Sequence, residues 1–190
     1  RVVAYSSVSH MGFVMLGLAA GTAEAVNGAV YVMLAHGLNS AMLFLLVGVY
    51  YDRLHTRDLN RMGGLFTAMP FASTMLAWAI FANLGLPGFS GFIGEFFTFL
   101  GTYGVWPGLV YLGLIGLVFV TVFSLWTLQR VAFGPERKGH EPLPDATPRE
   151  ALTLVPLAGL TLLLGVYPGF VFAVLNQPVA AVVQRLASGF

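Results

Sequence analysis

Three titratable side chains lie inside long apolar segments of this sequence: His10, His36 and Glu95. An ionised group at bilayer depth is costly unless it is paired, solvated or neutralised, so such a residue indicates a functional site by default. Imidazole takes up and releases protons near physiological pH, and a buried carboxyl group can hold a proton that an exposed one releases. The three residues together predict a proton relay within a membrane.

Polar residues accompany these groups, either at helical spacing from a histidine or beside the glycine-rich stretch before Glu95. They are Ser6, Asn39, Ser40 and Asn83. Hydroxyl and amide groups hold water, and water carries protons through apolar surroundings. We therefore expect a lateral polar row at mid-depth, with the two histidines and Glu95 as relay groups and these four residues in support.

A structural interpretation stays open, because an intramembrane His often serves only to hydrogen-bond a neighbouring helix. For Glu95 that interpretation requires a permanent cationic partner, and no Lys or Arg falls inside an expected span. A passive scaffold whose helices only anchor partner subunits therefore predicts a fixed cationic partner for Glu95 and no water beside it.

The composition indicates a membrane protein in contact with lipid. Hydrophobic residues make up 57% of the chain and charged residues 9%, whereas a soluble domain has about 25% charged residues. The net charge of +1 does not favour a nucleic-acid partner. The absence of Cys excludes disulfides and thiolate chemistry, and the sequence has no metal-site motif.

A membrane-spanning helix needs about 20 mainly apolar residues, and five segments meet that requirement. They are residues 2–20, 26–51, 67–100, 106–131 and 151–171. We expect an all-α bundle over residues 1–175, followed by a C-terminal tail over residues 176–190 that forms a short interfacial helix.

The third segment is too long for one simple span, and residues 83–91 divide it into two shorter helices. The residues that predict this break are Gly85, Pro87, Gly88 and Gly91. A broken helix is tolerated at membrane depth where protein or a water-filled cavity covers the freed backbone groups. The break lies directly before Glu95, so we expect it to shape the surroundings of that carboxylate.

The basic residues are distributed unevenly between the two sides of the expected bundle. Eight of the nine fall on one side: Arg1, Arg53, Arg57, Arg61, Arg130, Arg137, Lys138 and Arg149. Only Arg185 falls on the other side, so the positive-inside rule places the N-terminus in the cytoplasm and the C-terminus outside. The chain opens on an apolar segment without Met or a signal-peptide pattern, which we interpret as a fragment that lacks an upstream part.

Four strings resemble, in order along the whole chain, the antiporter-like membrane subunits of respiratory complex I. They are RVVAYSSVSHMG (1–12), LAHGL (34–38), HTR (55–57) with GG (63–64), and NLGLPGFSGFIGEF (83–96). The broken helix of the subunit M branch, the counterpart of mitochondrial subunit 4, has Glu at the position that Glu95 resembles. The L and N branches usually have Lys there.

The resemblance implies about fourteen membrane helices with two inverted repeats of five, each containing a broken helix. This chain would match the last five helices, the second-repeat half. It implies that His10, His36 and Glu95 lie on a central hydrophilic axis, whose other Glu and Lys groups would precede Arg1. The fragment should therefore not pump protons alone.

The resemblance also implies a function as a proton-translocating subunit of NADH-quinone oxidoreductase in a bacterial inner membrane. L-type and N-type subunits would be its partners, while NADH, FMN, iron–sulfur clusters and quinone would bind elsewhere in the complex. This chain itself would hold no cofactor and perform no redox chemistry. The alternative is a homologous subunit of a multisubunit Na⁺/H⁺ antiporter or a membrane-bound hydrogenase.

Overall fold

A computed structural model describes residues 2–135 and 143–188, and within these it contains helices and no strand. The helices are α1 (Val2–Ala20), α2 (Ala23–Leu54), η1 (Leu59–Arg61), α3 (Leu65–Ala68), α4 (Pro70–Asn83), α5 (Ser90–Tyr103), α6 (Pro107–Ala132), α7 (Pro148–Val166) and α8 (Gly169–Ser188). The predicted all-α class is confirmed. Arg1, Arg137 and Lys138, which entered the charge argument, lie outside the described residues.

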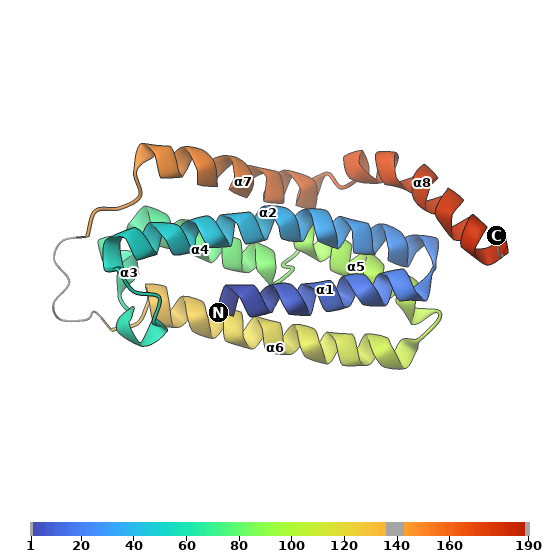
Figure 1. Ribbon diagram of the computed structural model, residues 1–190, viewed down its shortest axis with the longest axis horizontal. Coiled ribbons are helices and arrows are strands. Elements are labelled where there is room, and N and C mark those ends of the chain that lie inside the picture. Colours follow the sequence, from blue (N-terminus) through green and yellow to red (C-terminus); the bar gives the residue numbers. More distant parts are fainter. Residues whose placement is uncertain (1, 136–142, 189–190) are drawn as a thin grey trace.

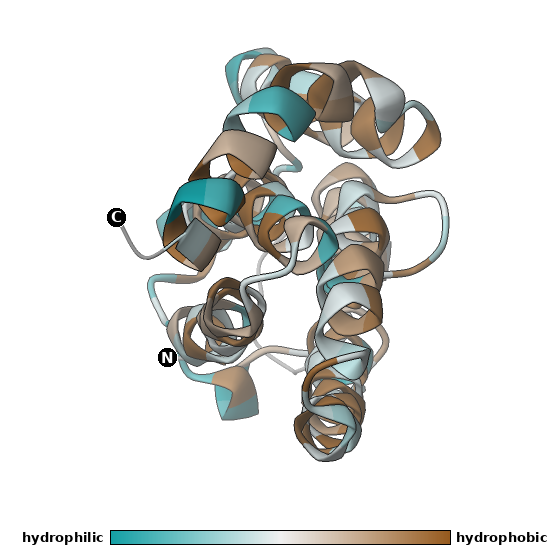
Figure 2. Cartoon of the chain, turned by 90° about the vertical axis from the view of Figure 1, so that its right-hand side faces the viewer, coloured by the Kyte–Doolittle hydropathy of each residue, from teal (hydrophilic) through white to brown (hydrophobic). Residues whose placement is uncertain are grey.

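Helix α2 is the centre of the bundle and packs against α1, α4, α5, α7 and α8 (Figure 1). Its 32 residues correspond to a length of about 48 Å, which exceeds the roughly 30 Å of a bilayer's hydrocarbon core. Hydrophobic residues recur along the helices (Figure 2), and many large apolar side chains are exposed, Leu112, Phe119 and Leu152 among them. A surface of this kind suits contact with lipid or with other membrane helices.

Length and hydropathy identify five of the described helices as candidate membrane spans: α1, α2, α6, α7 and α8. The first four overlap the predicted spans 2–20, 26–51, 106–131 and 151–171. The predicted broken span is present as α4 and α5, which have 14 residues each and so extend only about 21 Å apiece. The predicted break separates them.

The last helix begins earlier than the sequence indicated. Pro168 has no N–H to continue α7, and α7 ends at Val166. Helix α8 then starts at Gly169 and continues through Pro178 to Ser188, so it takes in the end of the predicted fifth span and most of the predicted tail. In Figure 1 it continues past the end of α2.

The Arg53 side chain, at the end of α2, forms hydrogen bonds with the segment that leads into α7. Its guanidinium donates to the two carboxylate oxygens of Glu150 at 2.9 and 2.7 Å and to the carbonyls of Pro144, Asp145 and Val49. These five bonds use all five N–H donors of an arginine. The start of α7 is therefore held against the end of α2.

Asp145, in the same connection, caps the first arm of the broken helix. Its carboxylate accepts from the backbone N–H of Phe71 at 2.7 Å and of Ala72 at 3.1 Å, in the first turn of α4. The residue in the N-cap position, Met69, makes no side-chain cap bond. A side chain more than 70 residues further along the chain thus supplies the missing acceptor.

Replacing Asp145 with Ala should destabilise α4, because two N–H groups lose their acceptor and the helix dipole loses a nearby negative charge. Losing a cap costs about 1 kcal/mol, and we expect a lower unfolding temperature for the complete detergent-solubilised protein. Asp52→Ala, at an exposed position near the end of α2, is the matched control. Equal shifts in the two variants would contradict the capping role.

Candidate proton-transfer site

The structure places Glu95 of α5 against His10 of α1. The distance between Oε1 of Glu95 and Nδ1 of His10 is 3.2 Å, and each side chain is only 6% exposed. No Lys or Arg falls inside an expected span, so a permanent cationic partner was not expected. The partner is instead a histidine, which is charged only when protonated, so the pair is itself titratable.

His36 of α2 extends this pair sideways across the bundle. The ring centroids of His10 and His36 are 5.2 Å apart, with the ring planes at 33°. Nε2 of His10 is buried and has no hydrogen-bond partner within the described part of the chain. Buried polar atoms are rarely left without a partner, so this nitrogen is the histidine atom of the site that still lacks one.

A small cavity lies beside the three titratable groups. Its volume is about 10 Å³, close to the least that one water molecule requires. Its walls come from α1, α2, α4 and α5, and the lining residues are His10, Val32, Ala35, His36, Asn39, Ala82, Asn83, Gly91 and Glu95. The predicted relay groups and two of the four predicted supporting residues therefore line one cavity.

Asn39 and Asn83 join α2 to the end of α4 at this cavity. The amide nitrogen of Asn39 donates to Oδ1 of Asn83 at 3.0 Å. With its amide turned over, Asn39 instead donates to the Ala79 carbonyl at 2.9 Å and accepts from the backbone N–H of Asn83 at 3.2 Å. Both orientations hold the last turn of α4 against α2, so the pair fixes one side of the break.

The break itself is built from glycines at strained or crowded positions. Gly85 and Gly88 have φ values of +63° and +99°, a region that favours glycine. A Cβ on Gly85 would lie 2.5 Å from Oε2 of Glu95, so this glycine leaves room for the carboxylate. Gly91 likewise lets the first turn of α5 approach the Ala82 carbonyl. Pro87 lies exposed in the turn between them.

Two residues expected to support the site are not at the cavity. The Ser6 hydroxyl donates to the Val3 carbonyl at 2.8 Å, and the Ser40 hydroxyl donates to the Gly37 carbonyl at 3.3 Å. Serine hydroxyls in helices often bond to the preceding turn in this way. Helical spacing predicted that each serine shares a helix face with a histidine. In the structure neither hydroxyl is bonded to His10, His36 or Glu95.

Two glycines that were not among the predicted site residues set the distance between α5 and α2. A Cβ on Gly94 would lie 2.7 Å from the Val32 backbone nitrogen, and one on Gly28 would overlap the Thr98 backbone nitrogen. Gly94 precedes Glu95 directly, so this close packing determines where the carboxylate lies. The available signal was the recurrence of glycine along one face of α5, at Gly94 and Gly101.

The profile of the family described as "NADH:quinone oxidoreductase/Mrp antiporter, TM" matches residues 1–124. The chain belongs to this antiporter family. Subunit M of NADH-quinone oxidoreductase from Pseudomonas aeruginosa is 47% identical over 168 residues, which are 88% of this chain and 33% of that relative. Subunit M from Rhodobacter capsulatus is 42% identical over 186 residues, 97% of this chain and 36% of the relative.

A solved structure has the same fold as this chain. It is respiratory complex I from Thermus thermophilus with bound NADH, one chain of which matches with a TM-score of 0.89 and 33% identity, over 97% of this chain and 38% of that chain. The resemblance to the subunit M branch is confirmed. The chain spans about a third of the length of the curated relatives it matches.

Proposed function

We propose that this chain is part of a proton-translocating membrane subunit of NADH-quinone oxidoreductase, of the M type. The observation that carries the proposal is the buried pair of His10 and Glu95 beside a cavity of the size of a water molecule. The two subunit M relatives support the assignment to this enzyme. Quinone reduction elsewhere in the complex would drive the transfer.

The geometry accounts for how a proton would move. With the proton on His10 the pair is an ion pair, and with the proton on Glu95 both groups are neutral. The two forms differ by a transfer between atoms 3.2 Å apart. A water molecule in the cavity would connect the pair with His36, so the proton would travel from helix to helix, in the plane of the membrane.

The same proposal also implies where the cofactors bind, which subunits are partners and how the chain is oriented in the membrane. NADH, FMN, iron–sulfur clusters and quinone would bind in other subunits, and L-type and N-type subunits would be its membrane partners.

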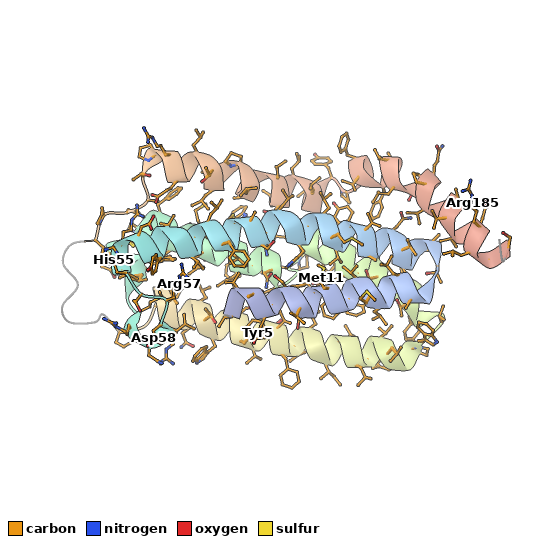
Figure 3. The ribbon with its side chains drawn as sticks, viewed as in Figure 1. Tyr5, Met11, His55, Arg57, Asp58 and Arg185 are labelled. Atoms are coloured by element: carbon orange, nitrogen blue, oxygen red, sulfur yellow. The ribbon has the colours of Figure 1, made fainter. Side chains whose placement is uncertain are left out.

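His55, Arg57 and Asp58 lie at one end of the bundle and Arg185 at the other (Figure 3). In a bacterial inner membrane, the positive-inside rule would place the arginine-rich end in the cytoplasm and the C-terminus outside.

The His36→Ala variant tests this proposal in the complete enzyme. We expect fewer protons moved per electron pair, with a smaller loss than at Glu95 because water can occupy the vacated space. Ser40→Ala is the matched control, because Ser40 lies on the same helix away from the cavity. Equal proton yields in the His36 variant and the native enzyme would remove His36 from the relay.

A second candidate is ion exchange in a multisubunit Na⁺/H⁺ antiporter, because the family description names Mrp antiporters beside the oxidoreductase. A homologous subunit of a membrane-bound hydrogenase is the other alternative that the sequence leaves open. Genes for quinone-reducing subunits beside this one would support the oxidoreductase, and genes for antiporter subunits would contradict it. A passive scaffold is disfavoured, since the partner of Glu95 is titratable and a cavity adjoins the pair.

A further inference from the structure

The last turn of α7 lies directly against the break between α4 and α5. A Cβ on Gly165 would overlap the Gly88 carbonyl oxygen and would lie 2.5 Å from the carbonyl carbon of Phe89. Only a glycine permits this approach, which brings a Cα–H group to a carbonyl outside any helix. Such contacts recur where helices meet closely.

Tyr31 of α2 holds α7 in that place. Its hydroxyl donates to the Leu164 carbonyl at 2.6 Å, and the side chain has no exposed surface. Within a helix that carbonyl would accept from the residue four positions later. Here that residue is Pro168, which has no N–H, so Tyr31 provides the donor that the end of α7 lacks.

Trp78 of α4 makes a second attachment to α7. Its indole N–H donates to the Thr161 hydroxyl at 3.3 Å. The same indole packs edge-on against Phe89, with ring centroids 5.3 Å apart. Helix α7 is therefore attached on one side to α2 and on the other side to the arm of the break that α4 forms.

We propose that α7 is the cover of the Gly88–Phe89 side of the helix break, and that Tyr31 and Gly165 are the positioning residues that keep this side closed. Freed backbone groups at membrane depth need protein around them or a water-filled cavity. The face of α7 that bears Gly165 covers the loop, while Leu152 and Leu163 on α7 are exposed.

The consequence for proton transfer rests on the proposed function. Gly85 in the same loop lies against the Glu95 carboxylate, so a displaced cover would admit water beside the titratable pair. We expect an open cover to let protons escape from the relay, which would lower the number moved per electron pair.

A cysteine placed in the loop measures whether the break is covered, because this chain has no native Cys. The reporter is Phe89→Cys in the complete membrane complex, labelled with a small membrane-permeant maleimide and followed by the mass of this subunit. Adding Tyr31→Phe leaves a buried carbonyl without a donor, and we expect labelling on the order of tenfold faster. Adding Gly165→Ala should accelerate labelling at least as much.

Each variant has a matched control. Tyr50→Phe removes another buried hydroxyl of α2, which bonds to Ser73 at 3.3 Å. Gly159→Ala adds a methyl group to α7 at a position with open space around it. Both controls should label as slowly as the reporter alone.

Unchanged labelling with Tyr31→Phe in an assembled complex would overturn the cover, even if Gly165→Ala fails to assemble. Equal acceleration by Tyr50→Phe would also overturn it, because the effect would then be general loosening. The proton yield is measured separately on the same variants. A Glu95 variant with normal proton yield would contradict the proposed function and leave the labelling result standing.

Discussion

Replacing Glu95 with Gln is expected to lower sharply the number of protons moved per electron pair by the complete NADH-quinone oxidoreductase that we propose contains this chain. Gln has nearly the same shape and can still contact His10, so the subunit should assemble. It cannot take up and release a proton. Loss of a positioned acid–base group typically slows proton transfer by about 100-fold or more, which is enough to stop this relay during turnover.

The comparison variants for this result are Glu95→Asp and Glu24→Gln. Aspartate keeps the titratable group but draws it back from His10, so an intermediate proton yield is expected. Glu24 is an exposed residue in the first turn of α2, and its replacement should leave the yield unchanged. A normal proton-to-electron ratio in assembled Glu95→Gln enzyme would contradict the assignment of Glu95 as a relay group.

The second large effect is expected from Gly28→Ala, through the packing of α2 on α5. A Cβ at this position would overlap the Thr98 backbone nitrogen and would lie 2.7 Å from the carbonyl carbon of Phe97. Backbone atoms cannot rotate away, so α5 has to move and take Glu95 with it. Overpacking of this kind costs about 1–3 kcal/mol or more. We expect both a lower unfolding temperature and a lower proton yield.

Gly37→Ala is the control on the same helix, because no atom beyond the adjoining turns of α2 lies within 4 Å of the added methyl group. Alanine is favoured over glycine in a helix by roughly 1 kcal/mol, so this variant should be neutral or slightly stabilising. Equal unfolding temperatures of the two alanine variants would contradict this role of Gly28. So would an intact proton yield in assembled Gly28→Ala protein.

The broad arrangement could be predicted from the sequence because its signals are local. Apolar length predicted four spans that match described helices. Glycine and proline placed a break over residues 83–91, and the helices on either side end at Asn83 and begin at Ser90. The C-terminal region was harder, because Pro168 and Pro178 look alike in the sequence, yet only Pro168 lies between two helices.

The composition of the site was predictable, but its pairing was not. Titratable residues in apolar segments pointed to His10, His36 and Glu95 before any contact was known. Which histidine meets the carboxylate depends on how α1 is rotated and how closely α5 approaches. Both depend on packing between distant parts of the chain, so helical spacing cannot distinguish a residue that reaches the cavity from one, such as Ser6, that does not.

The positive charge of Arg53 counts fully in the sequence but contributes less to the surface of the folded protein. While a chain inserts, a free guanidinium contributes to the bias that sets its orientation. In the folded protein the Arg53 side chain is 8% exposed and paired with Glu150, and every N–H it carries already has an acceptor. Anionic lipid headgroups at this end therefore meet a less positive surface than the number of arginines suggests.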